Sequence, residues 1–549
     1  MKRIVIAFLA AVVGICSAAS LYAGEERRDQ RPLSDDSSPL VFILPPVENV
    51  RVMYEKFLPL RDYLEKVLSR KISLKIAQNY QDAIEEIGSG EARLAYLDPA
   101  AYCEARHQHR IIPIVKTVWN GLSTYRSVIV TRKDSGINKI IEAKGKRFAL
   151  GNTSSSSSYL IPAVMFKEVG ISLADFASVD YLEQEDRIAL SVLARRHDIG
   201  GLSERVAQKY LGDGLRIINV SEAIPQYTLC GSASLPAGLR DRIRKSLLAL
   251  DKTGTPALAG AMNEIDGFAP AEDRDFDVVR VMIKNLTGKN YLEYGKNSIK
   301  VAILPLYSAI TLFDRFDPLM RYLTRQTGYE FKLVIPRDFE DFFDKVSRGD
   351  IQFSYSNPYI YIQLADHGYL SAFANTLIRD SGDIFRGIII THTGSSVRTL
   401  NDLRGRRVMV VSFKSAGGFL AQKLLLNENG IDVFKDLQLT EGKRQEEVIL
   451  NVYRKTVDAG FVRETALDVL KEEIDLGAIR IIARTPYIAN WPFAAARNTD
   501  RRIVEAVRKS LLDLREIEVL SAAKIEAFKP ASDGDFDDLR KRIGSYEGK

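Results

Sequence analysis

Residues 153–158, a threonine followed by five serines, are the part of this chain whose side chains are best suited to holding an anion. The apolar segment 146–150 before the run predicts a strand, and the segment that follows, up to Gly170, predicts a helix. Serine hydroxyls and unpaired backbone N–H groups would converge at the start of that helix, where the helix dipole also favours negative charge. The pattern fits an oxyanion site, and it also fits a plain helix cap followed by a flexible serine-rich loop.

The sequence contains no arrangement of residues that would support catalysis. Its five histidines lack the spacing to cysteine or glutamate that a metal site needs. Neither a nucleophile elbow nor a glycine-rich phosphate loop ending in Lys-Ser or Lys-Thr occurs. We therefore expect no catalytic residue, no metal site and no cofactor, and we expect that the protein is not an enzyme.

Length and charge bound the class of protein. A chain of 549 residues exceeds what one hydrophobic core usually supports, so we expect roughly two to four folding units. The 77 lysines and arginines nearly balance the 71 acidic residues, and the formal charge of +6 is spread along the chain. Because no basic stripe is interleaved with aromatic residues, we expect no nucleic-acid partner.

The N-terminus carries a pattern typical of export. Lys2 and Arg3 precede an apolar segment, 4–15, and small residues lead to Ala23, so residues 1–23 are predicted to be a signal peptide. The apolar segment is short for a retained membrane anchor, and the residues before Cys16 match a lipidation box poorly. We expect a periplasmic protein that does not span the membrane, with a disordered leader at 24–39.

Removal of the signal peptide leaves two cysteines, Cys103 and Cys230. In an oxidising compartment they could pair, but two cysteines in a chain this long do not make a disulfide framework. We expect buried free thiols.

From Leu40 onward, short β-rich segments alternate with helical ones, which predicts an α/β fold with mostly parallel sheets. The expected strands are 40–44, 72–76, 92–97, 127–131, 147–150 and 215–220, and the expected helices include 54–68, 81–87 and 187–193.

The same pattern occurs twice, displaced by about 260 residues, which indicates a duplicated domain rather than a solenoid repeat. We expect a first unit at 40–284, a linker at 285–298 and a second unit at 299–549. Matching positions include Leu44-Pro45 with Leu304-Pro305, 57–64 with 316–323, Asp98-Pro99 with Asn357-Pro358, Ser155 with Ser415, Asp198 with Asp458, and Pro225 with Pro492.

Each copy resembles the phosphate- and phosphonate-type periplasmic substrate-binding proteins of ABC transporters, and the resemblance covers nearly the whole chain after the signal peptide. In the first copy it rests on 79–84, on 95–102, on Tyr125-Arg126-Ser127, on the serine turn and on Asp198-Ile199-Gly200. The resemblance implies a type II binding-protein fold, in which two α/β lobes are joined by crossing strands and close on a ligand.

The resemblance also implies roles for individual residues. Ser155, Ser156 and Ser157 would donate hydrogen bonds to phosphoryl-type oxygens. Tyr80, Tyr125 and Ser127 would line the same site. Asp198 would face an amine substituent of the ligand, or would be a structural carboxylate at a strand-to-helix turn. Ser158, where the family usually has glycine, and Gln184-Glu185, where a histidine is expected, depart from the family pattern.

The second copy has lost donors of this site: Tyr80 becomes Phe339, Tyr125 becomes Phe385, and the three serines become Ser415, Ala416 and Gly417. We expect a degenerate site that binds a less polar molecule or nothing. Its available cleft groups would be Tyr355, Asn357, Arg386 and Trp491.

Two functions fit these observations. In the first, unit 1 captures a small oxyanion, such as phosphate, phosphite or a phosphonate, for an ABC transporter permease. In the second, the same cleft reads its ligand for a membrane sensor, and unit 2 serves as part of the docking surface.

Overall fold

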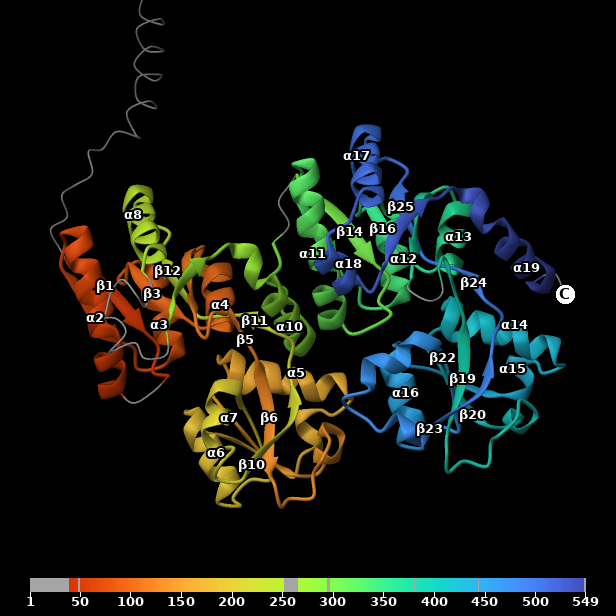
Figure 1. Ribbon diagram of the computed structural model, residues 1–549, viewed down its shortest axis with the longest axis horizontal. Helices are drawn as coiled ribbons and strands as arrows, with labels where there is room; N and C mark the ends of the chain where they lie inside the picture. Colours follow the sequence, from red (N-terminus) through yellow and green to blue (C-terminus); the bar gives the residue numbers. More distant parts are fainter. Residues whose placement is uncertain are drawn as a thin grey trace, which may run out of the picture.

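The computed structural model of the chain describes residues 39–47, 50–250, 265–293, 297–378, 382–442 and 444–547. The predicted signal peptide, Cys16 and residues 24–38 of the predicted leader lie outside the described residues. The described part forms two units side by side, and each unit consists of two α/β lobes (Figure 1). The predicted α/β class and the tandem bilobal arrangement are therefore confirmed.

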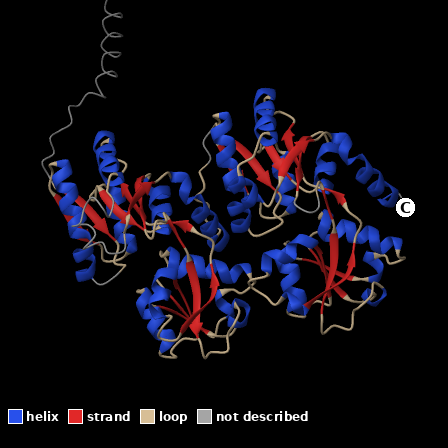
Figure 2. Cartoon of the chain, in the orientation of Figure 1, coloured by secondary structure: helices blue, strands red, loops and turns tan. Residues whose placement is uncertain are grey.

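The first lobe of unit 1 is a six-stranded sheet with the order β13-β4-β12-β3-β1-β2. Helices lie on its faces (Figure 2). In α2, five buried apolar residues from Met53 to Leu68 recur every three or four positions, which gives the helix one apolar face for the sheet. The elements are β1 (Leu40–Leu44), α2 (Val50–Leu68), β2 (Ile72–Ile76), α3 (Tyr80–Ser89), β3 (Leu94–Leu97), α4 (Pro99–His109), β4 (Ile112–Val118), β12 (Thr228–Gly231), α8 (Ala237–Leu248) and β13 (Gly267–Pro270).

The second lobe of unit 1 is a five-stranded sheet with the order β10-β6-β9-β7-β8. Two short antiparallel strands, β5 (Thr124–Tyr125) and β11 (Ile224–Pro225), carry the chain between the lobes. The elements of the lobe are β6 (Ser127–Arg132), β7 (Arg147–Leu150), α5 (Ile161–Glu168), β8 (Ser178–Tyr181), α6 (Glu185–Leu193), β9 (Ile199–Ser203), α7 (Glu204–Tyr210) and β10 (Leu215–Val220).

Each sheet combines parallel and antiparallel strands. In the first lobe, β1 pairs in parallel with β2 and β3, whereas β12 is antiparallel to β3 and β4. The reversal follows from the path of the chain, because β12 returns from the second lobe while β1 to β3 are linked by helices within the first. The parallel strands end at the edge that faces the other lobe, where ligands of open α/β sheets bind.

Unit 2 repeats this arrangement, with sheets β15-β14-β16-β25-β17-β26 and β21-β20-β22-β19-β23. Its first lobe has β14 (Ile299–Ile303), α11 (Ala309–Thr327), β15 (Phe331–Val334), α12 (Phe339–Ser347), β16 (Phe353–Tyr355), α13 (Pro358–Asp366), β17 (Leu370–Leu377), β25 (Pro492–Ala496), α17 (Arg501–Leu512), α18 (Ile517–Ala523), β26 (Ala527–Pro530) and α19 (Asp537–Glu547). Its crossing strands are β18 (Ile384–Phe385) and β24 (Ile488–Ala489). Its second lobe has β19 (Gly387–His392), β20 (Arg407–Val410), α14 (Ala421–Glu428), α15 (Val433–Asp436), β21 (Gln438–Glu441), α16 (Gln445–Tyr453), β22 (Ala459–Arg463) and β23 (Ile479–Arg484).

Strand register corrects one predicted match between the copies. Pro225 lies in the crossing strand β11, whose counterpart in unit 2 is β24, so Pro225 corresponds to Ala489. Pro492 instead begins β25, the counterpart of β12. The sequence between the two crossing strands is longer in unit 2, which shifts the offset between the copies beyond this point.

The two units are in direct contact through α10 (Asp277–Thr287) of unit 1 and α11 of unit 2. Asp277 accepts hydrogen bonds from Arg280 at 2.7 Å and from Lys332 of unit 2 at 3.2 Å. Asp275 joins Lys116 at 2.9 Å to Arg321 of unit 2 at 3.0 Å. One buried and one partly buried carboxylate therefore bridge the junction between the units.

Cys103 and Cys230 are free and buried, which confirms the prediction of unpaired thiols.

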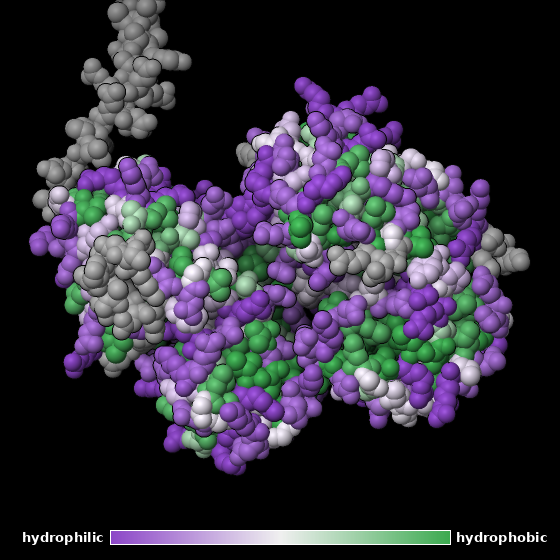
Figure 3. Space-filling model, in the orientation of Figure 1, coloured by the Kyte–Doolittle hydropathy of each residue, from purple (hydrophilic) through white to green (hydrophobic). Residues whose placement is uncertain are grey.

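On the face shown in Figure 3, polar side chains predominate at the periphery and apolar side chains gather over the two lower lobes. Among the residues that the structure describes, no helix has the length and apolar character to cross a membrane.

Candidate functional site

The serine run connects β7 to α5, as the sequence predicts. Ser155 precedes one turn of π-helix, Ser156–Leu160, and its Oγ accepts hydrogen bonds from the N–H and the hydroxyl of Ser158, at 3.3 and 2.9 Å. Ser155 to Ser158 are all buried, so the alternative of a flexible serine-rich loop does not hold. Single π-helical turns of this kind occur often at functional sites.

Most of the predicted serine donors already have partners inside the protein. Ser127 donates from Oγ to the carbonyl of Ser157 at 2.5 Å. Ser157 donates from its own Oγ to Glu185 at 2.5 Å, and the Ser156 hydroxyl accepts from the N–H of Ala100 at 2.8 Å. The turn is thus in direct contact with α4 of the other lobe, and the cleft of unit 1 is closed.

Asp98 makes the second bond between the lobes. It caps α4, accepting from the N–H groups of Ala100 and Ala101 at 2.9 and 3.0 Å. Its other oxygen accepts from the N–H of Ser156 at 2.6 Å. Burial raises the pKa of Asp98 to about 6, although these hydrogen bonds act to lower it. The Asp98 carboxylate therefore accepts a hydrogen bond from Ser156, a residue whose donors the sequence analysis assigned to the ligand.

Glu185 is the second carboxylate of this cleft, at the start of α6. Besides the Ser157 hydroxyl, it accepts from the N–H of Ser203 at 3.1 Å and from the Ser203 hydroxyl at 2.5 Å. It thereby ties the serine turn to the end of β9. Two acidic side chains in contact with the oxyanion donors make the site electronegative.

Tyrosines complete the wall of the cleft. Tyr80 is buried at the start of α3, and Tyr125 lies in the crossing strand β5 with its hydroxyl buried and without a hydrogen-bond partner among the described residues. Burial raises the pKa of both phenols well above the usual range, and the charges of Asp98 and Glu185 raise it further. The ring of Tyr227 lies 6.3 Å from that of Tyr125. Tyrosine faces beside carboxylates are a setting that favours a cationic group.

The structure thus brings together Tyr80, Tyr125, Ser127, Ser155, Ser156 and Ser157. The sequence analysis did not assign Asp98, Glu185, Ser203 or Tyr227 to the site. The sequence marks Asp98 as part of the repeat and of the segment 95–102 that carries the resemblance, and Glu185 only as a departure from the family pattern. A carboxylate at both positions was the signal that could have revealed an acidic cleft.

Asp198 lies away from this site. It precedes β9, and its carboxylate accepts from the backbone N–H and the guanidinium of Arg147 at 2.9–3.1 Å. Arg147 begins β7 and Ser155 follows the end of β7, so the ion pair lies at the opposite end of the strand from the cleft. Of its two predicted roles, the geometry supports the structural one, and Asp458 repeats it with Arg407 in unit 2.

The equivalent cleft of unit 2 keeps the backbone path and changes the side chains. Ser415 caps the turn by accepting from the N–H of Gly418 at 3.0 Å, as Ser155 caps its turn. A Cβ at Gly417 would lie 2.8 Å from the ring of Phe385, so glycine is needed where that ring packs against the turn. Gln422 donates to the Gly417 carbonyl at 2.9 Å, which replaces the bond that Ser127 makes in unit 1.

The predicted cleft groups of unit 2 divide into two sets. Tyr355 and Trp491 line a cavity of about 1150 Å³, which also has walls from unit 1, among them Glu168 and Glu222, and so lies between the two units. Arg386 is instead paired with Glu464 at 2.6 and 3.0 Å, and Asn357 caps α13. The cavity is also lined by Arg463 and Arg315, which the sequence analysis did not assign to the site.

Within the part of the chain that the structure describes, no group of three or more histidine, cysteine or acidic side chains is placed to hold a metal ion.

Two α/β lobes joined by crossing strands, with polar side chains converging at the face between them, define a bilobal solute-binding protein. A sequence profile described as "ABC transporter, phosphonate, periplasmic substrate-binding protein" matches residues 42–276 and again 301–536. The chain belongs to this family, in two tandem copies, as the resemblance predicts. The family is one of binding proteins.

Individual relatives are distant. The tetrathionate sensor histidine kinase TtrS of Salmonella typhimurium is 23% identical over 230 residues, which is 39% of this chain and 39% of that protein. The phosphate-import protein PhnD of Mycolicibacterium smegmatis is 22% identical over 211 residues, 36% of this chain and 66% of that protein. The chain therefore spans less than two thirds of the length of either relative.

The similar solved structures also have low sequence identity to this chain. PhnD1 of Prochlorococcus marinus in complex with methylphosphonate is 19% identical, covers 46% of this chain and all of its own, and gives a TM-score of 0.43. The periplasmic domain of BvgS from Bordetella pertussis is 15% identical, covers 93% of this chain and 94% of its own, and gives a TM-score of 0.31.

Proposed function

We propose that the protein is a periplasmic solute-binding protein whose unit 1 closes on a small phosphorus oxyanion that also carries a cationic group. Family membership supports a solute-binding role. A phosphorus oxyanion agrees with the names of two similar proteins: the PhnD1 structure is a complex with methylphosphonate, and the Mycolicibacterium relative is a phosphate-import protein. Ser155, Ser156, Ser157, Ser127, Tyr80 and Tyr125 are the proposed oxyanion donors.

One observation carries the choice of ligand. The serine turn is in hydrogen-bond contact with two carboxylates, Asp98 at the Ser156 N–H and Glu185 at the Ser157 hydroxyl. A ligand that carried only negative charge would face both carboxylates in a site with few competing water molecules, where like charges repel strongly. A zwitterion with an ammonium group toward Glu185 and the tyrosine rings avoids this repulsion.

Binding would exchange partners within the closed cleft. The oxyanion takes the Ser156 N–H from Asp98 and the Ser157 hydroxyl from Glu185, and the ammonium group neutralises the released carboxylates. The lobes would then be joined through the ligand rather than through Asp98. Neutral donors release an oxyanion more readily than an arginine clamp would, which suits a protein that must pass its ligand on.

The test compares two phosphonates that differ in the amine. We expect 2-aminoethylphosphonate to raise the unfolding midpoint, by preferential binding to the native state, more than methylphosphonate does. In E185Q this preference should fall by at least about tenfold in Kd, because the ammonium group loses a charged partner. A wild-type protein that responds to neither compound, or an E185Q variant with unchanged preference, would contradict the proposal.

A second function, sensing rather than delivery, is favoured by the contact between the units. Arg454 of unit 2 donates to the Val169 carbonyl at the end of α5, the helix that the serine turn begins. Lys139, in the same lobe of unit 1 as α5, donates to the Glu472 carbonyl of unit 2 at 3.1 Å. A movement of that lobe on ligand binding would therefore reach unit 2, as a relay to a membrane sensor requires.

Hydrogen exchange separates the two functions. For a sensor, we expect the unit 1 ligand to change the exchange of amides in α16 and at 464–474 of unit 2. For delivery to an ABC transporter permease, changes confined to unit 1 suffice. Protection limited to unit 1 at saturating ligand would rule out the relay.

A further inference from the structure

Arg463 is a buried cation for which the described part of the chain supplies no counter-ion. It ends β22 in the cleft of unit 2 and is 7% exposed. Its Nε has no hydrogen-bond partner among the residues that the structure describes, and one terminal nitrogen contacts the Asn490 Oδ1 at 3.4 Å. The guanidinium lies over the Phe385 ring, 4.3 Å from its centre. Among the described residues, no carboxylate forms an ion pair with it. Burying a charge in this way is costly unless a partner arrives.

The neighbours of Arg463 are also unused donors. The indole Nε1 of Trp491 and the side-chain nitrogen of Asn490 are buried and have no acceptor within the described part of the chain. The Nε of Arg315 is likewise unpartnered, while its guanidinium lies 4.9 Å from the centre of the Tyr307 ring. Native proteins leave few buried polar groups unpaired, so several unpaired donors at one place call for a missing acceptor.

The same positions in unit 1 explain why this arginine has no partner. Ser203 and Arg463 occupy equal register positions, opposite Ser127 and Gly387. Glu185 accepts from the N–H of Ser203 at 3.1 Å, and Gln445 accepts from the N–H of Arg463 at 2.9 Å. Unit 2 thus has a neutral amide in place of the carboxylate that would have paired with the arginine.

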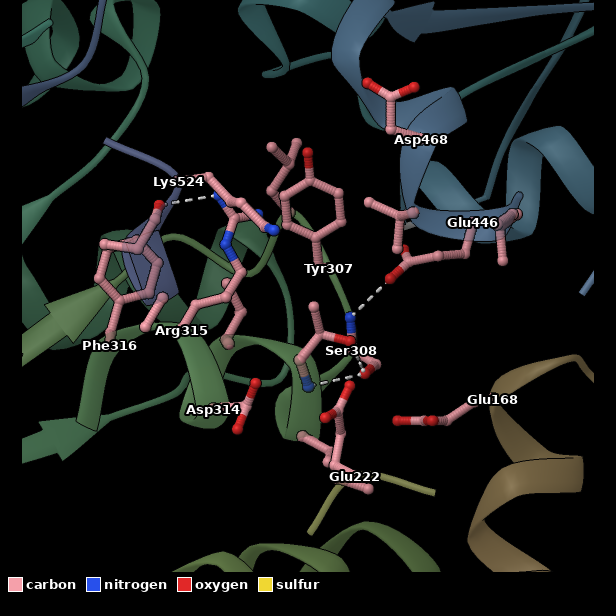
Figure 4. A pocket seen from close by; sticks show the side chains of 18 of the residues that line it. Glu168, Glu222, Tyr307, Ser308, Asp314, Arg315, Phe316, Glu446, Asp468 and Lys524 are labelled. Carbon is pink, nitrogen blue, oxygen red and sulfur yellow. Dashed lines mark hydrogen bonds between the residues drawn. The ribbon is translucent and has the colours of Figure 1, made fainter. Parts of the chain in front are cut away.

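The cavity at Arg463 has a basic, aromatic side and an acidic side. Tyr307, Tyr355, Trp491, Arg315 and Arg463 line it, and the rings of Tyr355 and Trp491 are 5.2 Å apart. Figure 4 shows Arg315 and Tyr307 on one side, with Asp314 below Arg315, and Glu446 of unit 2 with Glu168 and Glu222 of unit 1 toward the other. Arginines flanked by aromatic faces suit an anionic head with a flat or apolar body. The carboxylates opposite disfavour a second negative charge on the ligand.

We propose that the cleft of unit 2 is a second ligand site, which binds a small organic monoanion such as a carboxylate or sulfonate. Its anionic head is bound by Arg463, with Arg315 and the Trp491 indole as further donors. The site is independent of the phosphonate site proposed in unit 1, because it uses none of the same residues.

The test is calorimetric titration of the purified chain with benzoate and methanesulfonate, with sulfate and choline as comparison ligands. We expect one benzoate per chain, weaker binding of the dianion sulfate, and no binding of choline to this cleft. R463Q should weaken the binding of benzoate at least about tenfold in Kd, because a charged hydrogen-bond donor is lost. The matched control is R407Q, an arginine on the same lobe that pairs with Asp458 at the far end of β20 and should leave benzoate unaffected.

Three results would overturn the proposal: no monoanion binds the wild type, R463Q binds benzoate as tightly as the wild type, or R407Q weakens benzoate as much as R463Q. Because R463Q removes an uncompensated buried charge, we expect its ligand-free unfolding midpoint to be no lower than that of the wild type. If R463Q does not fold, W491F tests the site by removing one donor, and an unchanged benzoate affinity in W491F overturns the proposal.

E185Q keeps the two proposals separate. It should lose the amine preference in unit 1 and keep the benzoate affinity of unit 2, so either site can fail while the other stands.

Discussion

Where the cleft of unit 1 holds Asp98, the cleft of unit 2 holds Asn357, and both side chains cap the helix that follows. Glu185 is replaced by Gln445 and Ser203 by Arg463 at matching positions. The first cleft carries two carboxylates and the second carries an arginine. Three replacements on one backbone therefore invert the charge at these matched positions.

The comparison teaches how a duplicated binding unit can diverge without losing its fold. Asn357 still caps its helix and Gln445 still accepts the N–H at the end of β22, so these two replacements keep the structural hydrogen bond and change only the charge. The loss of serine and tyrosine donors in unit 2 does not leave the cleft apolar, because Arg463, Arg315 and Trp491 bring other donors.

The largest expected effect concerns an ion pair that also occurs twice. Asp277 and Arg280 are 6% and 2% exposed at the junction between the units, whereas the side chains of the equivalent Asp537 and Arg540 in α19 are 55% and 26% exposed. We expect D277N to lower the free energy of unfolding by about 1.5–3 kcal/mol, because Arg280 and Lys332 both lose a charged partner while Arg280 keeps Asp273. D537N, the matched control, should cost about 0–1 kcal/mol.

Urea denaturation of both variants measures this difference. Equal losses in D277N and D537N would mean that the junction between the units does not bury its charges, and the contact between the units would have to be revised.

The next effect comes from reversing the charge of one cleft. Q445E restores in unit 2 the carboxylate that Glu185 supplies in unit 1, next to the Arg463 backbone. We expect benzoate to bind at least about tenfold more weakly, because the arginine then has an internal partner. We also expect the ligand-free midpoint to rise. Calorimetry and thermal unfolding check both results, and unchanged benzoate binding in Q445E would show that the charge at this position does not set the specificity.

A smaller effect is the pH dependence of unit 1. The pKa of Asp98 is raised to about 6 from an ordinary value near 3.8, so between these pH values the folded protein holds a proton that the unfolded chain has lost. Stability from this group is therefore highest below pH 4, falls as the pH rises and levels off above about 6. An amine-bearing ligand that needs ionised Asp98 should bind about tenfold more weakly at pH 5 than at pH 7.

Titrations of 2-aminoethylphosphonate at pH 5, 6 and 7 measure this dependence. D98N is the control and should remove this contribution to it. Binding of the wild type that does not change over this range would exclude Asp98 as a group that the ligand faces.

The smallest effect is expected from the acidic residues at the far end of each sheet. Burial is modest at Asp198 and Asp458, and hydrogen bonds from the neighbouring arginines lower the pKa of each carboxyl. We expect D198N and D458N each to cost about 1 kcal/mol or less and to leave ligand affinities unchanged. A selective loss of 2-aminoethylphosphonate binding in D198N would restore the role in amine recognition that the sequence left open for Asp198.

Much of the fold followed from the sequence because its signals are local. Apolar runs such as 40–44 mark buried strands, and the repeated Leu-Pro and Asp-Phe-Asp segments mark the duplication. The strand, turn and helix around Ser155 were predicted for the same reason.

The partners of each side chain did not follow from the sequence, because they depend on contacts between distant segments. Asp98 meets Ser156 across the cleft, and Glu185 meets Ser203 from the next strand. Arg463 could not be predicted because it matches Ser203, which no local pattern places in the site, and the insertion before Pro492 hid the match of Trp491 with Tyr227.

Crystals of the chain soaked with 4-iodobenzoate test the charge inversion most directly, because the iodine can be located by its anomalous scattering. The account predicts one strong iodine site beside Tyr355 and Trp491, with the carboxylate on Arg463, and no iodine in the cleft of unit 1. The account would be contradicted if 4-iodobenzoate lay in the cleft of unit 1, or if it were absent from the cleft of unit 2 at saturating concentration.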